Sequence, residues 1–296
     1  MDPIGITLVC DDGVALGGHW WRVPAGQRIG TVIVNCATGV LSRYYHRYAA
    51  FLAVHGFDAL TYDYRGIGPS RPANLKSVNW TWRHWGELDF EAAMVHALSR
   101  ASGAQVHVVG HSIGGFLPGY AGSAPQLASM LTVGAQYAYW RDYRAGRKFG
   151  QFMKWHVAMP AITSLWGYFP GRRLGWLEDL PRGVVDSWSF GSRRIEDRLP
   201  PSDRRRILDR FAAVTAPILA VGVSDDVFAT HAAMTRSLDY YSGAKATKVM
   251  LHPTDLDRES VGHFDLLHAR HESGFWLDTL LWLRDGINPW PHRRFD

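Results

Sequence analysis

The stretch VHVVGHSIGG, residues 106–115, decides the fold class of this chain. A β-branched apolar run stops there at glycines placed around one serine, Ser112, and a helix is expected to begin at that serine. The G-x-S-x-G pattern needs small residues because a sharp strand-to-helix turn leaves no room for flanking Cβ atoms. Ser112 is therefore predicted to be a nucleophile, with the backbone N–H of Ile113 as one donor to a developing oxyanion. A phosphate-binding loop or a plain turn is the alternative, and it is disfavoured because the stretch has neither a G-K-S/T ending nor a G-x-G-x-x-G pattern.

Strand-like and helix-like runs alternate on both sides of this stretch. Strands are expected over residues 5–10, 14–23, 31–36, 58–64, 106–110, 127–135, 216–223 and 246–252. Helices are expected over residues 41–56, 85–101, 230–241 and 272–286, and directly after Ser112. Parallel strands need crossover connections, which are usually helical. The alternation therefore predicts an α/β fold with a mainly parallel, doubly wound sheet.

The alternation stops after residue 136. Residues 137–190 hold 13 aromatic residues in 54 positions, and three prolines within them interrupt any long helix. We expect an α/β core formed by residues 1–136 and 206–296, with residues 137–205 inserted as a lid or cap. The aromatic side chains of this segment are expected to line an apolar pocket or to form the private core of the lid.

Basic residues are concentrated in and beside the same segment. Residues 141–210 contain 15 Lys and Arg against 8 Asp and Glu, whereas the formal net charge of the whole chain is +5. No nucleic-acid-binding motif accompanies them, so a solvated surface is favoured over a nucleic-acid partner. No apolar run has the length of a membrane-spanning helix, and the first residues do not resemble a signal peptide. These features predict a cytoplasmic protein without stable membrane insertion, and they leave the oligomeric state open.

A serine nucleophile needs a general base, which in this type of fold follows the acid in the chain. His263, in SVGHFDLLH, lies after the last core strand and before the final helix, where a side chain can turn over the sheet edge. His252 belongs to a strand end, and His268 and His271 approach the final helix. His111 is next to Ser112, but its side chain is expected to point elsewhere. His263 is therefore the predicted base.

The orienting acid is expected at the end of the strand over residues 216–223. Two aspartates stand there in SDDVFAT, and only one can face the histidine. Asp226 is preferred to Asp225 because the strand and turn are long enough to present the second carboxylate at the sheet edge. Asp225 is then expected to cap the following helix.

The second oxyanion donor is expected on the loop NCATGV, residues 35–40, after another core strand. Ala37 and Thr38 both fit, and Ala37 is preferred. The chain's two cysteines, Cys10 and Cys36, are interpreted as buried thiols, since no disulfide framework or metal-ligand pattern surrounds them. No cofactor and no metal ion are predicted.

Four motifs in this order resemble the α/β-hydrolase superfamily across almost the whole chain: NCATGV, DYRGIGPS at residues 63–70, GHSIGG, and the pair SDD and GHF. The sequence is similar in particular to a bacterial group of predicted hydrolases related to serine aminopeptidase-like and lysophospholipase-like enzymes. YFPGRRLGWLEDLP, inside the 137–205 segment, carries that narrower likeness. The resemblance implies the triad Ser112, Asp226 and His263. Two departures concern Cys36, where relatives have Gly or Pro, and Pro118, which is expected to shorten or kink the helix after Ser112.

The predicted function is hydrolysis of a carboxylic ester through an acyl-enzyme, with a small-molecule substrate that has an apolar part. Thioesterase, amidase or peptidase, acyltransferase and C–C bond hydrolase activities use the same triad and stay open. A non-catalytic protein that binds a hydrophobic ligand is less favoured, because Ser, Asp and His are all present. A metal-dependent hydrolase is disfavoured because the chain has no H-E-x-x-H motif.

Overall fold

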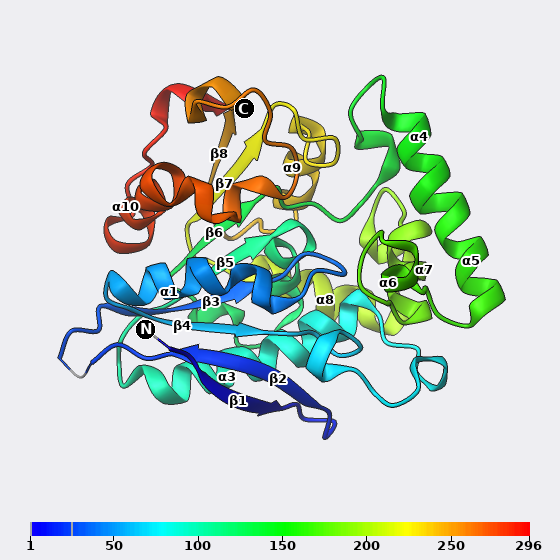
Figure 1. Ribbon diagram of the computed structural model, residues 1–296, viewed down its shortest axis with the longest axis horizontal. Coiled ribbons are helices and arrows are strands. Elements are labelled where there is room, and N and C mark those ends of the chain that lie inside the picture. The colour runs from blue at the N-terminus through cyan, green and yellow to red at the C-terminus, as the bar shows by residue number, and fades with distance from the viewer. Residues whose placement is uncertain (1, 25) are drawn as a thin grey trace.

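The computed structural model describes residues 2–24 and 26–296 and contains one nine-stranded sheet (Figure 1). The strand order is β1-β2-β4-β3-β5-β6-β7-β8-β9. The strands are β1 (Ile4–Val9), β2 (Ala15–Trp21), β3 (Gly30–Asn35), β4 (Phe57–Tyr62), β5 (Val106–His111), β6 (Ser129–Val133), β7 (Ile218–Val223), β8 (Ala246–Leu251) and β9 (Arg294–Phe295).

The centre of the sheet is parallel, as the sequence predicts. β4, β3, β5, β6, β7 and β8 pair in parallel, whereas β1, β2 and β9 join antiparallel at the two edges. Every residue of β3, β4, β5, β6 and β7 is buried, which explains why these strands are almost continuously apolar. The loops that follow the parallel strands therefore all lie at one edge of the sheet.

Helices connect these strands and cover both faces. They are α1 (His46–Val54), α2 (Trp82–His84), α3 (Glu91–Ala101), α4 (Lys148–Phe152), α5 (Met159–Trp166), α6 (Gly171–Leu174), α7 (Arg182–Ser189), α8 (Pro201–Ala213), α9 (His231–Leu238) and α10 (Leu277–Asp285). π-Helical turns join α2 to α3 and α4 to α5, and one precedes α10. No helix of the described residues is long and apolar enough to cross a membrane.

Two helices that lie far apart in the sequence pack together over one face of the sheet. The Tyr48 hydroxyl of α1 and the Thr279 hydroxyl of α10 are 2.8 Å apart, and the Trp282 indole of α10 donates to the Met130 carbonyl of β6. α3 lies across the sheet from them (Figure 1). This double cover confirms the predicted doubly wound arrangement.

The expected helix after Ser112 is replaced by two short 3₁₀ turns, Ser112–Gly115 and Leu117–Tyr120. Pro118 lies in the second turn and has no N–H to donate, so a regular helix cannot run through it. The segment is still held firmly, because Phe116 and Leu117 are buried and the Tyr241 hydroxyl donates to the Phe116 carbonyl. The elbow is therefore fixed by packing instead of by a long helix.

The DYRGIGPS turn is held by buried charges. The Arg65 guanidinium contacts Asp89 at 2.5 Å and Asp12 at 2.6 Å, and the side chains of Arg65 and Asp89 are 0% exposed. The Asp63 carboxylate accepts hydrogen bonds from the N–H and the hydroxyl of Ser42, near the start of α1. The motif thus ties the end of β4 to the helical layers on both sides. Removing one partner of a buried pair of this kind leaves an uncompensated charge, which is strongly destabilising.

The 137–205 segment contributes α4, α5, α6 and α7, which gather at one end of the molecule (Figure 1). α8 crosses the expected boundary at residue 205 and carries the chain back toward the core. The aromatic side chains of the segment pack on one another: the Trp155 and Trp188 rings stack with centroids 4.7 Å apart, and Trp176 meets Trp155 edge to face. Cys10 and Cys36 are both free and buried, as predicted.

Candidate active site

Ser112 stands at the end of β5 in a left-handed backbone conformation, with φ of +55°. This conformation is uncommon for a residue with a side chain, and strained residues of this kind cluster at functional sites. The glycines of the motif make the turn possible. A Cβ on Gly110 would lie 2.4 Å from the Cα of Gly115, and a Cβ on Gly114 would lie 2.6 Å from the Asn35 and Cys36 carbonyls.

Ser112, His263 and Asp226 form a continuous hydrogen-bonded chain. His263 Nε2 is 2.9 Å from Ser112 Oγ, and His263 Nδ1 is 2.6 Å from Asp226 Oδ2. The three side chains come from the loops after β5, β7 and β8, whose carboxyl ends meet at one sheet edge. Phe228 and Phe264 flank the imidazole, each with its ring centroid 5.0 Å away. The arrangement can move a proton from the serine to the imidazole while the carboxylate holds the ring.

The surroundings of the Asp226 carboxylate favour its ionised form although the group is buried. Burial alone would raise the pKa, but His263 and the N–H groups of Phe228 and Ala229 outweigh it and hold the Asp226 pKa below its ordinary value. An ionised Asp226 accepts from Nδ1–H and leaves Nε2 with its lone pair toward the serine.

Asp225 has a different task from the expected helix cap. Its two carboxylate oxygens accept hydrogen bonds from the N–H groups of Val261, at 2.8 Å, and Gly262, at 2.9 Å. The cap of α9 is Thr230, whose hydroxyl oxygen accepts from the N–H of Ala233. Asp225 cannot reach the helix start because both oxygens are directed at the loop before His263. It therefore positions the loop that carries the histidine.

The oxyanion loop also differs from the expectation. The backbone N–H of Ala37 donates to the Tyr45 hydroxyl at 2.9 Å, so its single proton is already used and Ala37 is not a free oxyanion donor in this conformation. Thr38, the alternative, and Ile113 keep backbone N–H groups that no residue within 2–24 and 26–296 accepts. Asn35 fastens the loop to the elbow, since its side-chain amide donates to the Gly114 carbonyl at 3.1 Å.

His111 completes a buried network behind the serine. Its Nε2 is 2.8 Å from the His263 carbonyl oxygen, and its Nδ1 is 2.8 Å from the Tyr45 hydroxyl. A carbonyl oxygen only accepts, so Nε2 must carry the proton and the Tyr45 hydroxyl must donate to Nδ1. The same hydroxyl accepts the Ala37 N–H. Every donor in this network therefore has one acceptor, and the network joins the oxyanion loop to the histidine loop.

We expect Tyr45→Phe to destabilise the fold by about 1–3 kcal/mol, because it leaves the Ala37 N–H and His111 Nδ1 buried without a partner. Urea unfolding measures this change. Tyr44→Phe is the matched control: its hydroxyl donates to the Phe264 carbonyl in a solvent-exposed place, where water can replace it, so a smaller loss is expected. Equal stability of Tyr45→Phe and the parent protein would show that the buried network does not have this role.

Comparison with known proteins identifies the family of this chain. A family model described as "Alpha/beta hydrolase family" matches residues 31–275, which is most of the chain. The chain belongs to the α/β-hydrolase family. The match begins in β3 and ends before α10, so it includes the oxyanion loop, Ser112, Asp226 and His263.

Proteins similar to this chain include a lipase and an esterase. The monoglyceride lipase of Saccharomyces cerevisiae (strain ATCC 204508 / S288c) is 26% identical over 106 residues, an alignment that covers 35% of this chain and 34% of the lipase. The solved structure of a soluble variant of that yeast lipase, in complex with a substrate analog, has a TM-score of 0.66 at 14% identity and covers 96% of this chain and 95% of its own. The Pyrococcus furiosus esterase Pf2001 has a TM-score of 0.61 at 14% identity, with 96% and 91% coverage. At these identities the structural likeness establishes the fold.

A cavity of about 240 Å³ opens over Ser112 and His263 in this α/β-hydrolase. Its walls come from the loops after β3, β5, β6, β7 and β8 and from the 137–205 segment. They comprise Ala37, Thr38, Ser112, Gln136, Gln151, Lys154, Trp155, Trp176, Leu177, Trp188, Phe228, His263 and Phe264. No cluster of three or more His, Cys, Asp or Glu in the described part of the chain is arranged to hold a metal ion.

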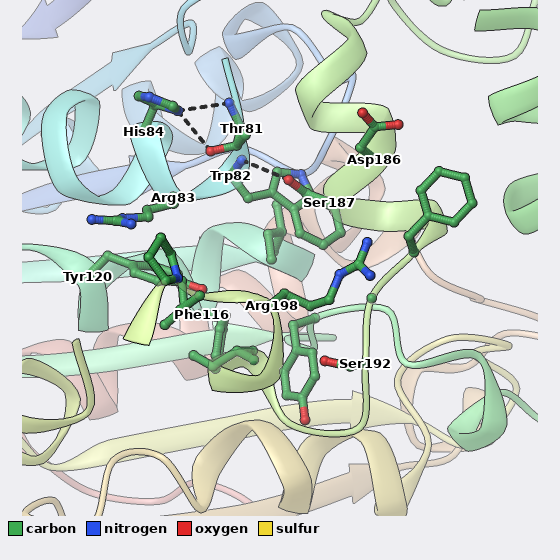
Figure 2. A pocket seen from close by; sticks show the side chains of 17 residues that line it. Thr81, Trp82, Arg83, His84, Phe116, Tyr120, Asp186, Ser187, Ser192 and Arg198 are labelled. Carbon is green, nitrogen blue, oxygen red and sulfur yellow. Dashed lines mark hydrogen bonds between the residues drawn. The ribbon is translucent and has the colours of Figure 1, made fainter. Parts of the chain in front are cut away.

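A second cavity, of about 300 Å³, adjoins the elbow at Ile113 (Figure 2). Trp82, Phe116, Tyr120 and other apolar side chains line it, and Figure 2 shows Arg198 reaching into it toward α7. The Trp82 ring, in this cavity, and the Trp188 ring, in the cavity over Ser112, lie 6.1 Å apart. The two cavities are therefore neighbours.

Sequence reasoning did not find several residues of this site. Gly134 follows β6 with φ of +58°, and a Cβ there would lie 3.2 Å from Asp226 Oδ2 and 3.3 Å from the His263 ring. A glycine directly after a core strand is the signal that could have identified it. Tyr45, Gln136 and Lys154 carry no comparable signal, because their places depend on how loops and helices pack over the sheet edge.

Proposed function

We propose that this α/β-hydrolase is a serine hydrolase that cleaves a carboxylic ester through an acyl-enzyme intermediate. The observation that carries the proposal is the unbroken hydrogen-bonded chain from Ser112 Oγ through His263 to Asp226, placed at the floor of a cavity. A serine hydroxyl becomes a useful nucleophile when a positioned base takes its proton. The monoglyceride lipase and esterase relatives support ester hydrolysis among the activities that such a triad can perform.

In the first half-reaction Ser112 Oγ forms a bond to the ester carbonyl carbon while His263 Nε2 takes the hydroxyl proton. The resulting imidazolium is held and stabilised by Asp226, which keeps its negative charge. When the tetrahedral intermediate collapses, the bond to the alcohol oxygen breaks and His263 returns the proton to that oxygen. The alcohol leaves, and the acyl group stays on Ser112.

In the second half-reaction water replaces the alcohol. His263 takes a proton from the water as its oxygen attacks the acyl carbonyl carbon, and the second tetrahedral intermediate expels Ser112 Oγ. His263 protonates that oxygen, so the carboxylic acid departs and the enzyme is restored. No cofactor takes part in either half-reaction.

Backbone N–H groups stabilise the oxyanion in both intermediates. Ile113 N–H is the first donor, because it follows the nucleophile directly and has no other acceptor among the residues described. Thr38 N–H is the second, since Thr38 lines the cavity over Ser112 while the neighbouring Ala37 N–H is bonded to Tyr45. Each donor of this type lowers the activation barrier by about 3–4 kcal/mol.

The 137–205 segment acts as the lid and forms part of the substrate-binding site. It supplies Trp155, Trp176 and Trp188 to the cavity over Ser112, and it supplies part of the wall of the second cavity. We assign the second, apolar cavity to an apolar part of the ester, because it begins at Ile113 beside the nucleophile and its lining includes Trp82, Phe116, Tyr120, Tyr137 and Phe190 (Figure 2).

Covalent labelling and a substrate series test this function. A fluorophosphonate probe is expected to label folded protein at Ser112, as located by peptide mass spectrometry, and heat-unfolded protein is expected to stay unlabelled. p-Nitrophenyl esters from acetate to palmitate are expected to give kcat/KM values that rise with chain length and then fall when the chain outgrows the two cavities beside Ser112. Absence of labelling and of turnover with every ester would contradict the proposal.

A further inference from the structure

The cavity over Ser112 carries one permanent charge, that of Lys154. Lys154 lies in the π-helical turn Met153–Ala158 between α4 and α5. Apart from the triad histidine, the other side chains that line this cavity are neutral, and none of those described is a carboxylate. A cation without a carboxylate in its own cavity is free to interact with a charged substrate.

Two tryptophans hold the ammonium group in place. Lys154 Nζ lies 4.5 Å from the ring centroid of Trp155 and 4.5 Å from that of Trp176. Trp155 is itself fixed, because its indole N–H donates to Gln151 Oε1 at 2.7 Å. Ring faces attract the charge of an ammonium group but offer no lone pair to its N–H donors. Lys154 is therefore positioned, and its hydrogen-bonding capacity is unused.

The pKa of Lys154 and its lack of a paired carboxylate among the described residues are consistent with unused N–H donors on its ammonium group. Its pKa is lowered by partial burial, and neither an ion pair nor a hydrogen bond compensates for the lost solvation within the described chain. By contrast, Arg194 and Arg172 of the same segment pair with Glu196 and Glu178.

Two glutamines add donors to the same cavity. Gln136 Oε1 accepts the Ala138 N–H, and Gln151 Oε1 accepts the Trp155 indole N–H. Each amide oxygen thus accepts one hydrogen bond from the protein, and neither NH₂ group has an acceptor among the described residues. Lys154, Gln136 and Gln151 therefore place unused N–H donors in the cavity that contains the nucleophile, and we call these three side chains the donor cluster.

We infer that this donor cluster is a carboxylate subsite and that the ester substrate carries a carboxylate in addition to its scissile ester bond. The inference rests on the proposed function, since it concerns the substrate of the same serine. A carboxylate fits better than a phosphate, because one ammonium and two amides match a single negative charge. The same lining disfavours substrates with a free amine, such as the N-terminus of a peptide, because no described carboxylate lines the cavity to receive an ammonium group.

A matched pair of esters tests the inference. p-Nitrophenyl hydrogen glutarate and p-nitrophenyl pentanoate have acyl chains of equal length, and they differ in a terminal carboxylate. Lys154→Met keeps an unbranched side chain between the two rings and removes the charge. We expect it to lower kcat/KM for the glutarate ester by about ten- to hundredfold, mainly through KM, the range expected for loss of a charge-assisted hydrogen bond. Turnover of the pentanoate ester is expected to stay near that of the parent protein.

Lys148→Met is the control, because Lys148 lies on the same helical run outside this cavity and donates to the Arg141 carbonyl. It is expected to change neither ester. An equal loss on both esters in Lys154→Met would overturn the inference and assign Lys154 a purely structural role, and no loss on the glutarate ester would also overturn it. Hydrolysis of the pentanoate ester by the parent protein shows that the proposed function itself stands in either case.

Binding without turnover gives an independent measurement. Calorimetry of monoethyl glutarate with Ser112→Ala protein is expected to show binding that the Ser112→Ala, Lys154→Met double variant loses. Equal affinity in the two proteins would overturn the carboxylate subsite whether or not the parent protein hydrolyses any ester.

Discussion

Ser112→Ala is expected to lower ester hydrolysis by about 10⁴- to 10⁶-fold and to abolish fluorophosphonate labelling, because the reaction loses its nucleophile. The effect should be on kcat, since the cavity and its apolar neighbour are unchanged. The hydrogen-bond partner of the hydroxyl is the His263 imidazole, and alanine keeps a small side chain in the turn, so the variant is expected to fold. Steady-state kinetics with p-nitrophenyl esters measure the loss, and far-UV circular dichroism checks that the protein is folded.

A matched control for this variant is Ser123→Ala. Ser123 follows the same 3₁₀ segment and bonds to Glu91, away from both cavities, so activity near that of the parent is expected. If Ser112→Ala and the parent turned over the esters equally fast, the hydrolysis would have to come from another group, and the assignment of Ser112 would be wrong.

Asp226→Asn is expected to lower kcat by about 10⁴-fold without changing the shape of the site. An amide in place of the carboxylate presents N–H or a neutral oxygen to His263 Nδ1, so the imidazole loses the partner that fixes its tautomer and stabilises its charged form. In the parent protein that partner lies 2.6 Å from Nδ1 and is 3% exposed. The pre-steady-state rate of acylation measures the effect directly.

Asp225→Asn makes the comparison decisive, because the two aspartates are neighbours and the substitution is the same. Asp225 accepts hydrogen bonds from backbone N–H groups of the histidine loop, whereas the imidazole bonds to Asp226 and Ser112, so a loss of about tenfold or less is expected. The reverse order, with Asp225→Asn the more damaging change, would identify Asp225 as the acid of the triad.

The strand ends of this site could be predicted from sequence because they follow from local patterns. β-Branched runs identify β5, β7 and β8, parallel pairing brings their carboxyl ends together, and the chain order then selects Ser112, Asp226 and His263. The structure brings these three side chains into contact, and their catalytic roles remain the predictions stated above.

The remainder of the site depends on contacts that no local pattern encodes. Position in the sequence favours Ala37 as an oxyanion donor, but its N–H donates a hydrogen bond to the hydroxyl of Tyr45, eight residues later. Asp225 resembles a helix cap in the sequence because it precedes α9 closely. The sequence does not reveal that Thr230 caps this helix, nor that the Asp225 carboxylate bonds to the loop before His263. Lys154 belongs to a basic segment that the sequence presents as a solvated surface, and a π-helical turn directs it to the cavity.

In the proposed mechanism, His111 and His263 together determine where positive charge can reside during turnover. The His111 and His263 rings lie 5.1 Å apart, and burial together with the neighbouring His263 lowers the His111 pKa to about 3. His111 already donates its one proton to the His263 carbonyl and accepts one from Tyr45, so it has no vacant lone pair to take a second. In the proposed mechanism, the proton that leaves Ser112 therefore has a single acceptor, the imidazole of His263, and is then transferred to the departing alcohol. A neutral His111 next to the proposed nucleophile would thus keep this proton on the reaction path.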